Sequence, residues 1–369
     1  MNLRTIVALG LLGMLPVSVA AETLHWGETA VFVTAIASII PLAIWLSTAT
    51  EELSIVLGPS LGALLNAVFG NATELIIALT ALRAGLVEIV KASITGTVMA
   101  NLLLCLGLSM LAGGIGRREQ TFQPVVARVN GSAMTLAVLA ILIPSLAVVG
   151  GTSGADTSRA IESFSVFVAW VLLLVYALTL LFSLRTHSAL YEVAEVDLQV
   201  EGAEPEAHRP PLLPWLAVLI GATVGIAYES EMFVGVVESV TESVGLSSVF
   251  TGVVLLPLLG GVAEYLTAVS MARKNKMDLS VSVSLGSTLL VALLVVPVLV
   301  LVGPLLGHPL DLSFQVYELV AVATAVVVSN LASLDGRSDW LEGVLLLAAY
   351  VILAAGFYFQ ATPSLTPIG

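Results

Sequence analysis

Two glutamates lie inside long apolar runs of the sequence, where an ionised side chain is costly. Glu74 falls in the run 60–83 and Glu264 in the run 247–272. A carboxylate at membrane depth costs several kcal/mol unless it is paired, protonated or bound to a metal ion. Neither run carries a Lys or Arg at the same depth. We therefore expect each carboxylate to be neutralised by a proton or by a cation.

The two routes to neutrality exclude each other and together predict exchange chemistry. Each carboxylate can take a proton, or both can share one divalent cation. Oxygen ligands without His or Cys favour Ca²⁺, and they are also compatible with Mn²⁺ or Mg²⁺. A carrier that reorients only when its site is neutral must return with protons. The acid pair therefore predicts a cation/proton antiporter without a resident cofactor, in which Ca²⁺ and H⁺ are the transported species.

Glycines and polar residues near the two acids could complete the cation site. Glycine and proline in mid-span weaken the backbone ladder and free carbonyl oxygens, which are hard ligands. Hydroxyl and amide groups on the next helix of each half could add oxygens, although Ser and Thr often bond a carbonyl of their own helix instead. The predicted metal-site residues are Glu74, Glu264, Asn71, Gly70, Gly260, Thr97, Ser287 and Asn101.

The composition is that of a membrane protein. Of 369 residues, 58% are hydrophobic and 11% are charged, against about 25% charged in soluble domains. Ten apolar runs have the length of membrane-spanning helices rather than barrel strands. They cover 30–50, 60–83, 88–113, 127–149, 161–184, 212–230, 247–272, 279–303, 314–333 and 339–360. We predict an all-α polytopic membrane protein embedded in a lipid bilayer.

Two segments lie outside these ten runs. An apolar run at 5–21 follows Arg4 and ends in Ala20-Ala21, which is typical of a removed signal peptide or of a retained leader helix. A hydrophilic acidic stretch separates the fifth run from the sixth; we interpret it as a solvated tether, with calcium sensing as the alternative. The predicted domains are residues 1–25 (leader), 26–184 (first five-helix unit), 185–211 (acidic linker) and 212–369 (second five-helix unit).

The positive charges predict the orientation. If Arg4 is cytoplasmic, ten of the 13 Lys and Arg residues lie in cytoplasmic segments, and Arg83, Lys91 and Arg159 lie on the opposite side. This asymmetry follows the positive-inside rule. It places the N-terminus and the linker in the cytoplasm, and we expect a bacterial-type inner membrane. With five helices in each unit, the second unit enters the membrane upside down.

An internal repeat agrees with this inversion. A shift of 190 residues aligns the second and third helices of the two units without a gap. Aligned pairs include Gly70 with Gly260, Glu74 with Glu264, Arg83 with Arg273, Glu88 with Asp278, Gly96 with Gly286, and Thr97 with Ser287. We therefore predict two inverted-topology repeats. Such repeats place the substrate site near the bilayer midplane, where broken helices of both halves meet.

These motifs resemble the calcium/proton exchanger (CAX) family of the cation/calcium exchangers. The stretch 58–114 is similar to the first repeat of that family, especially at Gly70-Asn71-Ala72-Thr73-Glu74-Leu75 and at Gly96-Thr97-Val98-Met99-Ala100-Asn101, and the tail 335–343 is similar to its end. The resemblance implies that Glu74 and Glu264 bind the cation and exchange it for protons. It also implies that carbonyls at the breaks and polar groups on the third and eighth helices assist, and that the first and sixth helices move.

The second repeat departs from the family pattern. Where the family usually has Gly-Asn-Ala-Ala-Glu-His, this chain has Gly260-Gly261-Val262-Ala263-Glu264-Tyr265, and Leu290 stands where a Gln is usual. Half of the predicted site therefore has fewer polar oxygens and no imidazole. Cation selectivity and proton stoichiometry are left open.

Other functions fit the sequence less well. A sodium-coupled exchanger usually carries further acids at mid-depth on the third and eighth helices, whereas Glu88 and Asp278 lie at helix starts. A membrane-embedded enzyme would need a nucleophile with a base or a metal centre, and no such motif occurs. A passive channel would share the carboxylates but would not move protons in return. The net charge of −13 disfavours binding to nucleic acid. The sequence leaves open whether the chain forms a homo-oligomer.

Overall fold

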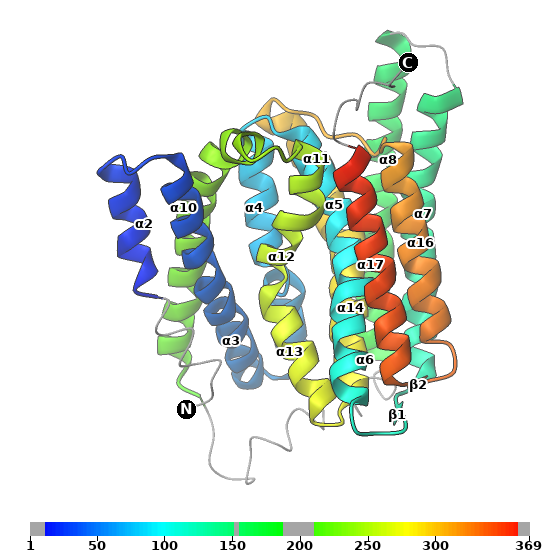
Figure 1. Cartoon of the computed structure of the whole chain (residues 1–369). Coiled ribbons are helices and arrows are strands. Elements are labelled where there is room, and N and C mark those ends of the chain that lie inside the picture. The colour runs from blue at the N-terminus through cyan, green and yellow to red at the C-terminus, as the bar shows by residue number, and fades with distance from the viewer. Residues whose placement is uncertain (1–11, 151–154, 187–209, 361–369) are drawn as a thin grey trace, which may run out of the picture.

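The protein is almost entirely helical in the part of the chain that the computed structural model describes, residues 12–150, 155–186 and 210–360 (Figure 1). The first half contains α2 (Met14–Thr23), α3 (Glu28–Phe69), α4 (Ala72–Arg83), α5 (Val87–Met99), α6 (Leu106–Gly114), α7 (Pro124–Gly150) and α8 (Ala155–Leu181). The second half contains α10 (Leu212–Ser243), α11 (Ser248–Phe250), α12 (Leu256–Gly260), α13 (Val262–Arg273), α14 (Met277–Leu290), α15 (Val296–Val302), α16 (Val316–Ala332) and α17 (Trp340–Gln360).

Short irregular turns join several of these helices into longer rods. Four are π-helical, namely η1 (Ala100–Cys105), η2 (Phe182–Thr186), η3 (Thr251–Leu255) and η4 (Val291–Val295), and η5 (Gly303–Leu306) is a 3₁₀ turn. Two-residue strands β1 (Gln120–Thr121) and β2 (Arg337–Ser338) pair antiparallel at one end of the bundle. π turns widen a helix locally and often occur at functional sites, and η3 directly precedes α12, which ends at Gly260.

The helices confirm an all-α membrane protein. Within the described ranges, seven helices are long and apolar enough to cross a membrane, and a bent pair, Ser248–Gly260 with Val262–Arg273, raises the number to eight. The shorter apolar helix α16 has 17 residues. Every apolar run from 30–50 onward overlaps one of the described helices, but the count of ten spans in two inverted repeats stays a prediction.

Several predicted boundaries were wrong. The sixth run was expected to end at residue 230, yet α10 continues to Ser243. The acids Glu231, Glu238 and Glu242, which follow the predicted run, therefore lie on the helix; Glu is a good helix former, and these side chains reach the helix surface. The first two runs are joined, because α3 passes a local non-helical turn at Gly58, whose φ is +78°. The linker region 187–209 and residues 1–11 of the leader lie outside the described residues.

The bundle has two hydrophobic cores. One lies between α3 and α10 and is built mainly from Leu42, Leu46, Leu53, Leu219 and Ile226, with the Trp45 and Trp215 rings 6.4 Å apart beside it. The larger core joins α5 and α6 to α13–α17 and to α7 and α8, and it also includes residues of α4 and of α3 and α10, such as Ile39 and Phe233. In Figure 1, α2, α3 and α10 accordingly stand together at one side of the bundle. The pair α3 and α10 is thus packed partly as a unit of its own.

Candidate functional site

Both predicted helix breaks are present, and each glutamate follows one. The helix before Glu74 ends at Phe69, Asn71 has non-helical angles (φ −118°, ψ 31°), and α4 begins at Ala72. The helix before Glu264 ends at Gly260, and α13 begins at Val262 after a bend of 60°. Each glutamate is therefore the third residue of a new half-helix.

This placement favours negative charge at both acids. The first turn of a helix has backbone N–H groups without intrahelical partners and carries the positive end of the helix dipole. Glu74 lies in the first turn of α4 and Glu264 in the first turn of α13. Figure 1 shows that α4 lies toward one end of the bundle and α13 toward the other. The positive ends of the two half-helices therefore face the interior of the bundle.

The side chain of Glu74 lies directly against the opposite break. Glu74 is buried, and a Cβ added at Gly260 would stand 2.7 Å from Glu74 Cγ and 3.2 Å from its Cδ. Only a residue without a side chain fits at this crossing. Both carboxylate oxygens of Glu74 are buried without a hydrogen-bond partner among the described residues. A buried carboxylate in this state requires a proton or a cation.

The second carboxylate belongs to the same region. Glu264 is half-buried in the first turn of α13, and it follows Gly260, which lies against Glu74, by four residues. Among the described residues, no group of three or more His, Cys, Asp and Glu side chains is placed so that it could hold a metal ion. A cation at this place would therefore depend on two carboxylates together with neutral oxygens, which suits a hard divalent ion.

Three of the predicted polar residues meet at one hydroxyl. The Nδ2 atoms of Asn71 and Asn101 donate to Ser287 Oγ over 2.7 and 3.0 Å, and all three residues are buried. Ser287 Oγ accepts both of these hydrogen bonds, because a hydroxyl oxygen has two lone pairs. With both amide nitrogens held by Ser287, the Oδ1 atoms of Asn71 and Asn101 are left to face other partners, including a cation.

The remaining predicted residues contribute less directly. Thr97 is buried on α5, one turn before Asn101. Gly70 does not mirror Gly260, because a Cβ at Gly70 would meet the Asn66 carbonyl of its own helix, 2.5 Å away. The structure thus brings together Glu74 with Gly260, and Asn71 with Ser287 and Asn101, whereas Gly70 faces its own helix.

Sequence reasoning missed two polar contacts in this region. The Tyr265 hydroxyl donates to the Pro257 carbonyl over 3.0 Å, and Ser284 Oγ lies within hydrogen-bond distance of Cys105 Sγ, 3.2 Å away. The spacing of four residues could have predicted that Ser284 bonds the Ser280 carbonyl of its own helix, and Ser284 Oγ does reach that carbonyl. Tyr265 could not be anticipated, because its bond spans eight residues across a break.

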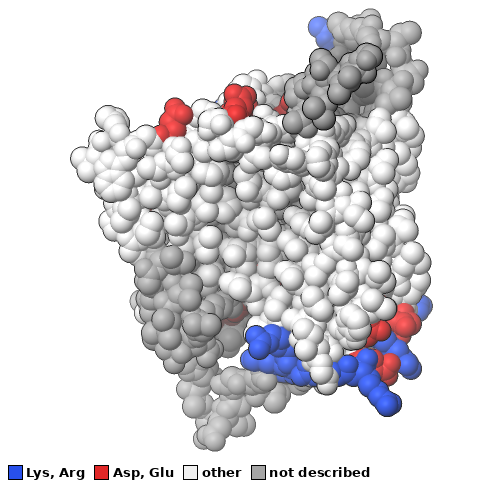
Figure 2. Space-filling model, viewed as in Figure 1, with Lys and Arg blue, Asp and Glu red and all other residues white. Residues whose placement is uncertain are grey.

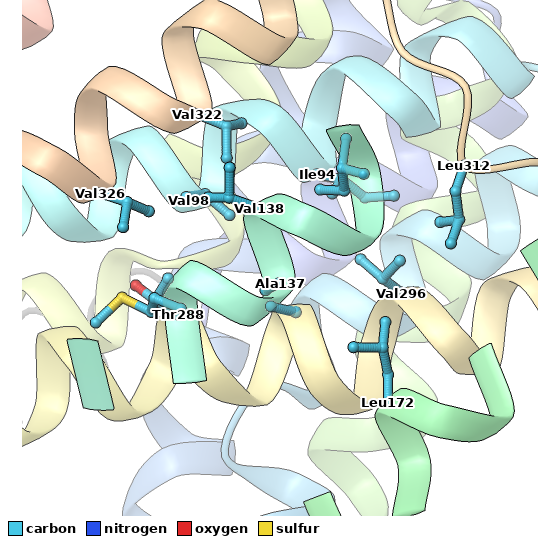
Figure 3. Close-up of a pocket in the computed structure, with 13 residues that line it drawn as sticks. Ile94, Val98, Ala137, Val138, Leu172, Thr288, Val296, Leu312, Val322 and Val326 are labelled. Atoms are coloured by element: carbon cyan, nitrogen blue, oxygen red, sulfur yellow. The ribbon is translucent and has the colours of Figure 1, made fainter. Parts of the chain in front are cut away.

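A cavity elsewhere in the bundle is apolar and is not the cation site. It lies between α5, α7, α8, α14, α15 and α16, and Ile94, Val98, Val138, Leu172 and Val296 project into it in Figure 3. Thr288 is the single hydroxyl residue among those that line it, and no acid lines it. Its chemistry is that of the hydrophobic core and does not suit a cation.

The surface carries an uneven distribution of charge. Figure 2 shows Lys and Arg gathered at one end of the visible face, below α13 and α6, while the flank between the two ends is almost free of charged side chains. A belt without charge suits the hydrocarbon core of a bilayer. The described structure therefore fits an integral multi-pass membrane protein.

Comparisons with known proteins agree with this site. A family model described as sodium/calcium exchanger protein matches residues 27–185 and 214–359. The chain is 51% identical over 365 residues to a Ca(2+)/H(+) antiporter of Aphanothece halophytica, covering 97% of each. It is 41% identical over 344 residues to the Ca(2+)/H(+) antiporter ChaA of Bacillus subtilis, covering 93% of this chain and 96% of that protein. The solved structure of native YfkE matches with a TM-score of 0.81 at 36% identity, covering 97% and 100% of the two chains.

Proposed function

Since the chain belongs to the sodium/calcium exchanger protein family, we propose that it is an antiporter that exchanges Ca²⁺ for H⁺ across a membrane. The two relatives described above are antiporters with this pair of substrates in their names. They confirm the predicted resemblance to the calcium/proton exchangers and the prediction of a transporter rather than an enzyme. The observation that carries the proposal is the buried acid Glu74, which lies against the break that precedes Glu264.

Glu74 and Glu264 hold the cation, and protons replace it. When Ca²⁺ is bound, the two carboxylates neutralise its charge, and the Oδ1 atoms of Asn71 and Asn101 supply neutral oxygens. When Ca²⁺ leaves, the two carboxylates are left without a counter-charge in a poorly solvated place. Protonation removes this cost, and only then does the empty carrier reorient. Coupling of the two ions follows from this exclusion.

Two unequal packing contacts support alternating access. On α5, a Cβ added at Gly96 would stand 2.1 Å from the Val253 carbonyl oxygen, so α5 and η3 are in close backbone contact. At the same position of its repeat partner on α14, Gly286, no described atom of another segment lies within 4 Å. One end of the site is therefore tightly closed while the equivalent place in the other half is open. We assign this conformation to the state that opens toward the end rich in Lys and Arg.

In a ten-helix inverted-repeat topology, the difference in packing between Gly96 and Gly286 corresponds to one of the two conformations of an alternating-access cycle. If the halves exchange their conformations, Gly286 closes and Gly96 opens, and the site faces the other side. The core that α3 and α10 share supports their movement as a pair. With the positive-inside rule, the Lys- and Arg-rich end is cytoplasmic, and the open side therefore faces the cytoplasm.

We also propose that the leader is a retained helix. Ser18 on α2 donates to Glu229 Oε2 on α10 over 2.7 Å, and both residues are fully buried. Tyr228 donates to Glu22 over 3.0 Å at the same contact. Removal of residues up to Ala21 would strip Glu229 of this hydroxyl. Mass spectrometry of the purified protein would detect Met14–Thr23 if the helix is retained.

Transport in proteoliposomes tests the proposed function. Vesicles with an acidic interior should take up Ca²⁺ as protons leave, and collapse of the pH gradient should stop net uptake. Glu74→Gln and Glu264→Gln should each abolish exchange, because an amide can neither carry the negative charge nor take up the proton. Thr34→Ala is a matched control in α3, since its hydroxyl bonds carbonyls of its own helix.

The same vesicles separate the competing functions. Uptake driven by a sodium gradient would favour the sodium-coupled alternative. Ca²⁺ flux that ignores both gradients would favour a channel. Normal exchange in Glu74→Gln or in Glu264→Gln would remove the assignment of the site. Replacement of Ca²⁺ by Mn²⁺ or Mg²⁺ would establish which other divalent ions are carried.

A further inference from the structure

The break in the second half of the site is closed by a phenol. The Tyr265 ring folds back over Gly261, where an added Cβ would stand 2.6 Å from both Cζ and the hydroxyl oxygen. From this position the hydroxyl donates to the Pro257 carbonyl, 3.0 Å away. Any side chain at Gly261 would occupy the space of the ring. Gly261 and Tyr265 therefore form a matched pair.

The Pro257 carbonyl has no free lone pair as a result. The backbone N–H of Gly261 donates to the same oxygen over 3.0 Å, and a carbonyl oxygen has two lone pairs. With the backbone N–H and the phenol both bound, Pro257 cannot bind a cation unless it gives one of them up. A carbonyl next to a helix break would otherwise be a ready hard ligand.

This carbonyl belongs to the site. Tyr265 is buried and directly follows Glu264 in the first turn of α13. Gly260, three residues after Pro257, contacts the side chain of Glu74. The phenol therefore acts on an oxygen that lies beside the acid pair.

The first half of the site is built differently. The positions equivalent to Gly261 and Tyr265 are Asn71 and Leu75. Asn71 points its amide nitrogen at Ser287 on another helix, which leaves its oxygen for a ligand, and Leu75 has no group that could bond a carbonyl. One half thus offers an extra oxygen, while the other half withdraws one.

We propose that Tyr265 is a specificity-determining positioning residue, which keeps the Pro257 carbonyl out of the cation's coordination shell and so limits the preference for Ca²⁺. Ca²⁺ takes six to eight oxygens, whereas Mg²⁺ keeps several of its waters and needs few protein ligands. A site that withholds one carbonyl therefore weakens Ca²⁺ binding more than Mg²⁺ binding. The proposal rests on the proposed function for its physiological meaning, because Ca²⁺ must be the transported ion.

Removal of one oxygen atom tests the proposal. In Tyr265→Phe, the ring still fills the space over Gly261 but no longer holds the carbonyl. We expect the KM for Ca²⁺ in proteoliposomes to fall about fivefold, the size of one net hydrogen-bonding interaction. The inhibition constant of Mg²⁺ should change little. Tyr350→Phe is the matched control, since its buried hydroxyl has no partner among the described residues, and its KM should equal that of the native protein.

A second variant reaches the same carbonyl by another route. Gly261→Ala keeps the phenol but displaces it, because the new Cβ would overlap the hydroxyl. If it folds, its KM for Ca²⁺ should fall as well. A merely structural role for Tyr265 predicts a lower kcat with an unchanged KM. An unchanged or raised KM in Tyr265→Phe, or an equal shift in Tyr350→Phe, would overturn the proposal.

Binding without transport distinguishes this inference from the proposed function. The rise in melting temperature caused by Ca²⁺ in detergent reports affinity directly. If the native protein shows no proton-driven Ca²⁺ uptake, the proposed function fails, and the thermal shift still compares the variants. A larger Ca²⁺-dependent shift in Tyr265→Phe than in the native protein supports the inference. An equal or smaller shift refutes it.

Discussion

The shared hydroxyl of Ser287 provides the sharpest test of how the site is held together. Ser287→Ala removes the acceptor of two amide donors, Asn71 Nδ2 and Asn101 Nδ2. Asn71 and Asn101 are 3% and 1% exposed, so water cannot replace the lost acceptor without a rearrangement. A buried donor without a partner costs about 1–3 kcal/mol. We therefore expect Ser287→Ala to destabilise the protein by about 2–4 kcal/mol.

The same change should weaken cation binding. Ser287 holds both amides by their nitrogen atoms and so presents both Oδ1 atoms to the site. Without it, the amides can rotate, and the KM for Ca²⁺ should rise. Ser287→Thr keeps the hydroxyl and should restore both properties. Thermal unfolding in detergent, followed by tryptophan fluorescence, measures stability, and initial uptake rates measure KM.

A control on the same helix makes the test specific. Ser280 is also buried on α14, but its hydroxyl has no partner among the described residues. Ser280→Ala removes the same atom and leaves no donor orphaned, so stability should change by less than about 0.5 kcal/mol. Native stability in Ser287→Ala, or an equal loss in Ser280→Ala, would refute the reasoning that the two amides depend on one acceptor.

Two further predictions concern close packing and pH. Gly260→Ala should impair transport strongly, because its Cβ would stand 2.7 Å from Glu74 Cγ, whereas Gly235→Ala, on the exposed face of α10, meets no described atom within 4 Å and should keep the native uptake rate; equal rates in the two variants would contradict this. Burial acts to raise the pKa of the loop residue Asp311, but hydrogen bonds from Lys91 (2.6 Å) and Ser313 outweigh it, and the pKa is lowered. The stability from this pair is therefore complete above the ordinary Asp pKa and is lost as the pH falls through the lowered one. Asp311→Asn should cost about 1 kcal/mol at neutral pH, and its difference from the native protein in thermal unfolding should shrink in strong acid; a constant difference would contradict the assignment.

The sequence was most informative where a residue type conflicts with its surroundings. Glu74 in an apolar run predicted a site, and glycine beside it predicted a broken helix, because both features are costly unless they serve a purpose. The break after Gly260 followed from the same reasoning. These predictions needed only local chemistry and the expected membrane depth.

The partners of the polar groups were beyond this reasoning. The contact from Asn71 to Ser287 joins residues 216 positions apart, and its geometry depends on how two half-helices cross. Thr97 and Ser287 are equivalent in the repeat, yet Ser287 accepts two amides while Thr97 is placed on another helix without a similar role. The sixth run was predicted to end at residue 230, whereas α10 continues to Ser243, because an apolar run marks the membrane-spanning part of a helix and not its end.

The two halves of the site offer the cation different ligands. A symmetric repeat would offer the cation the same ligands from both sides, and both conformations of the carrier would then bind it equally. Here one half presents Asn71 and the other presents Gly261, and the hydroxyls at Ser287 and Tyr265 serve different carbonyl and amide groups. When the halves exchange conformations, the ligands that face each side of the membrane therefore differ. Cation affinity on the two sides must differ as well unless other contacts compensate, and measurement of KM from each side in oriented vesicles would determine by how much.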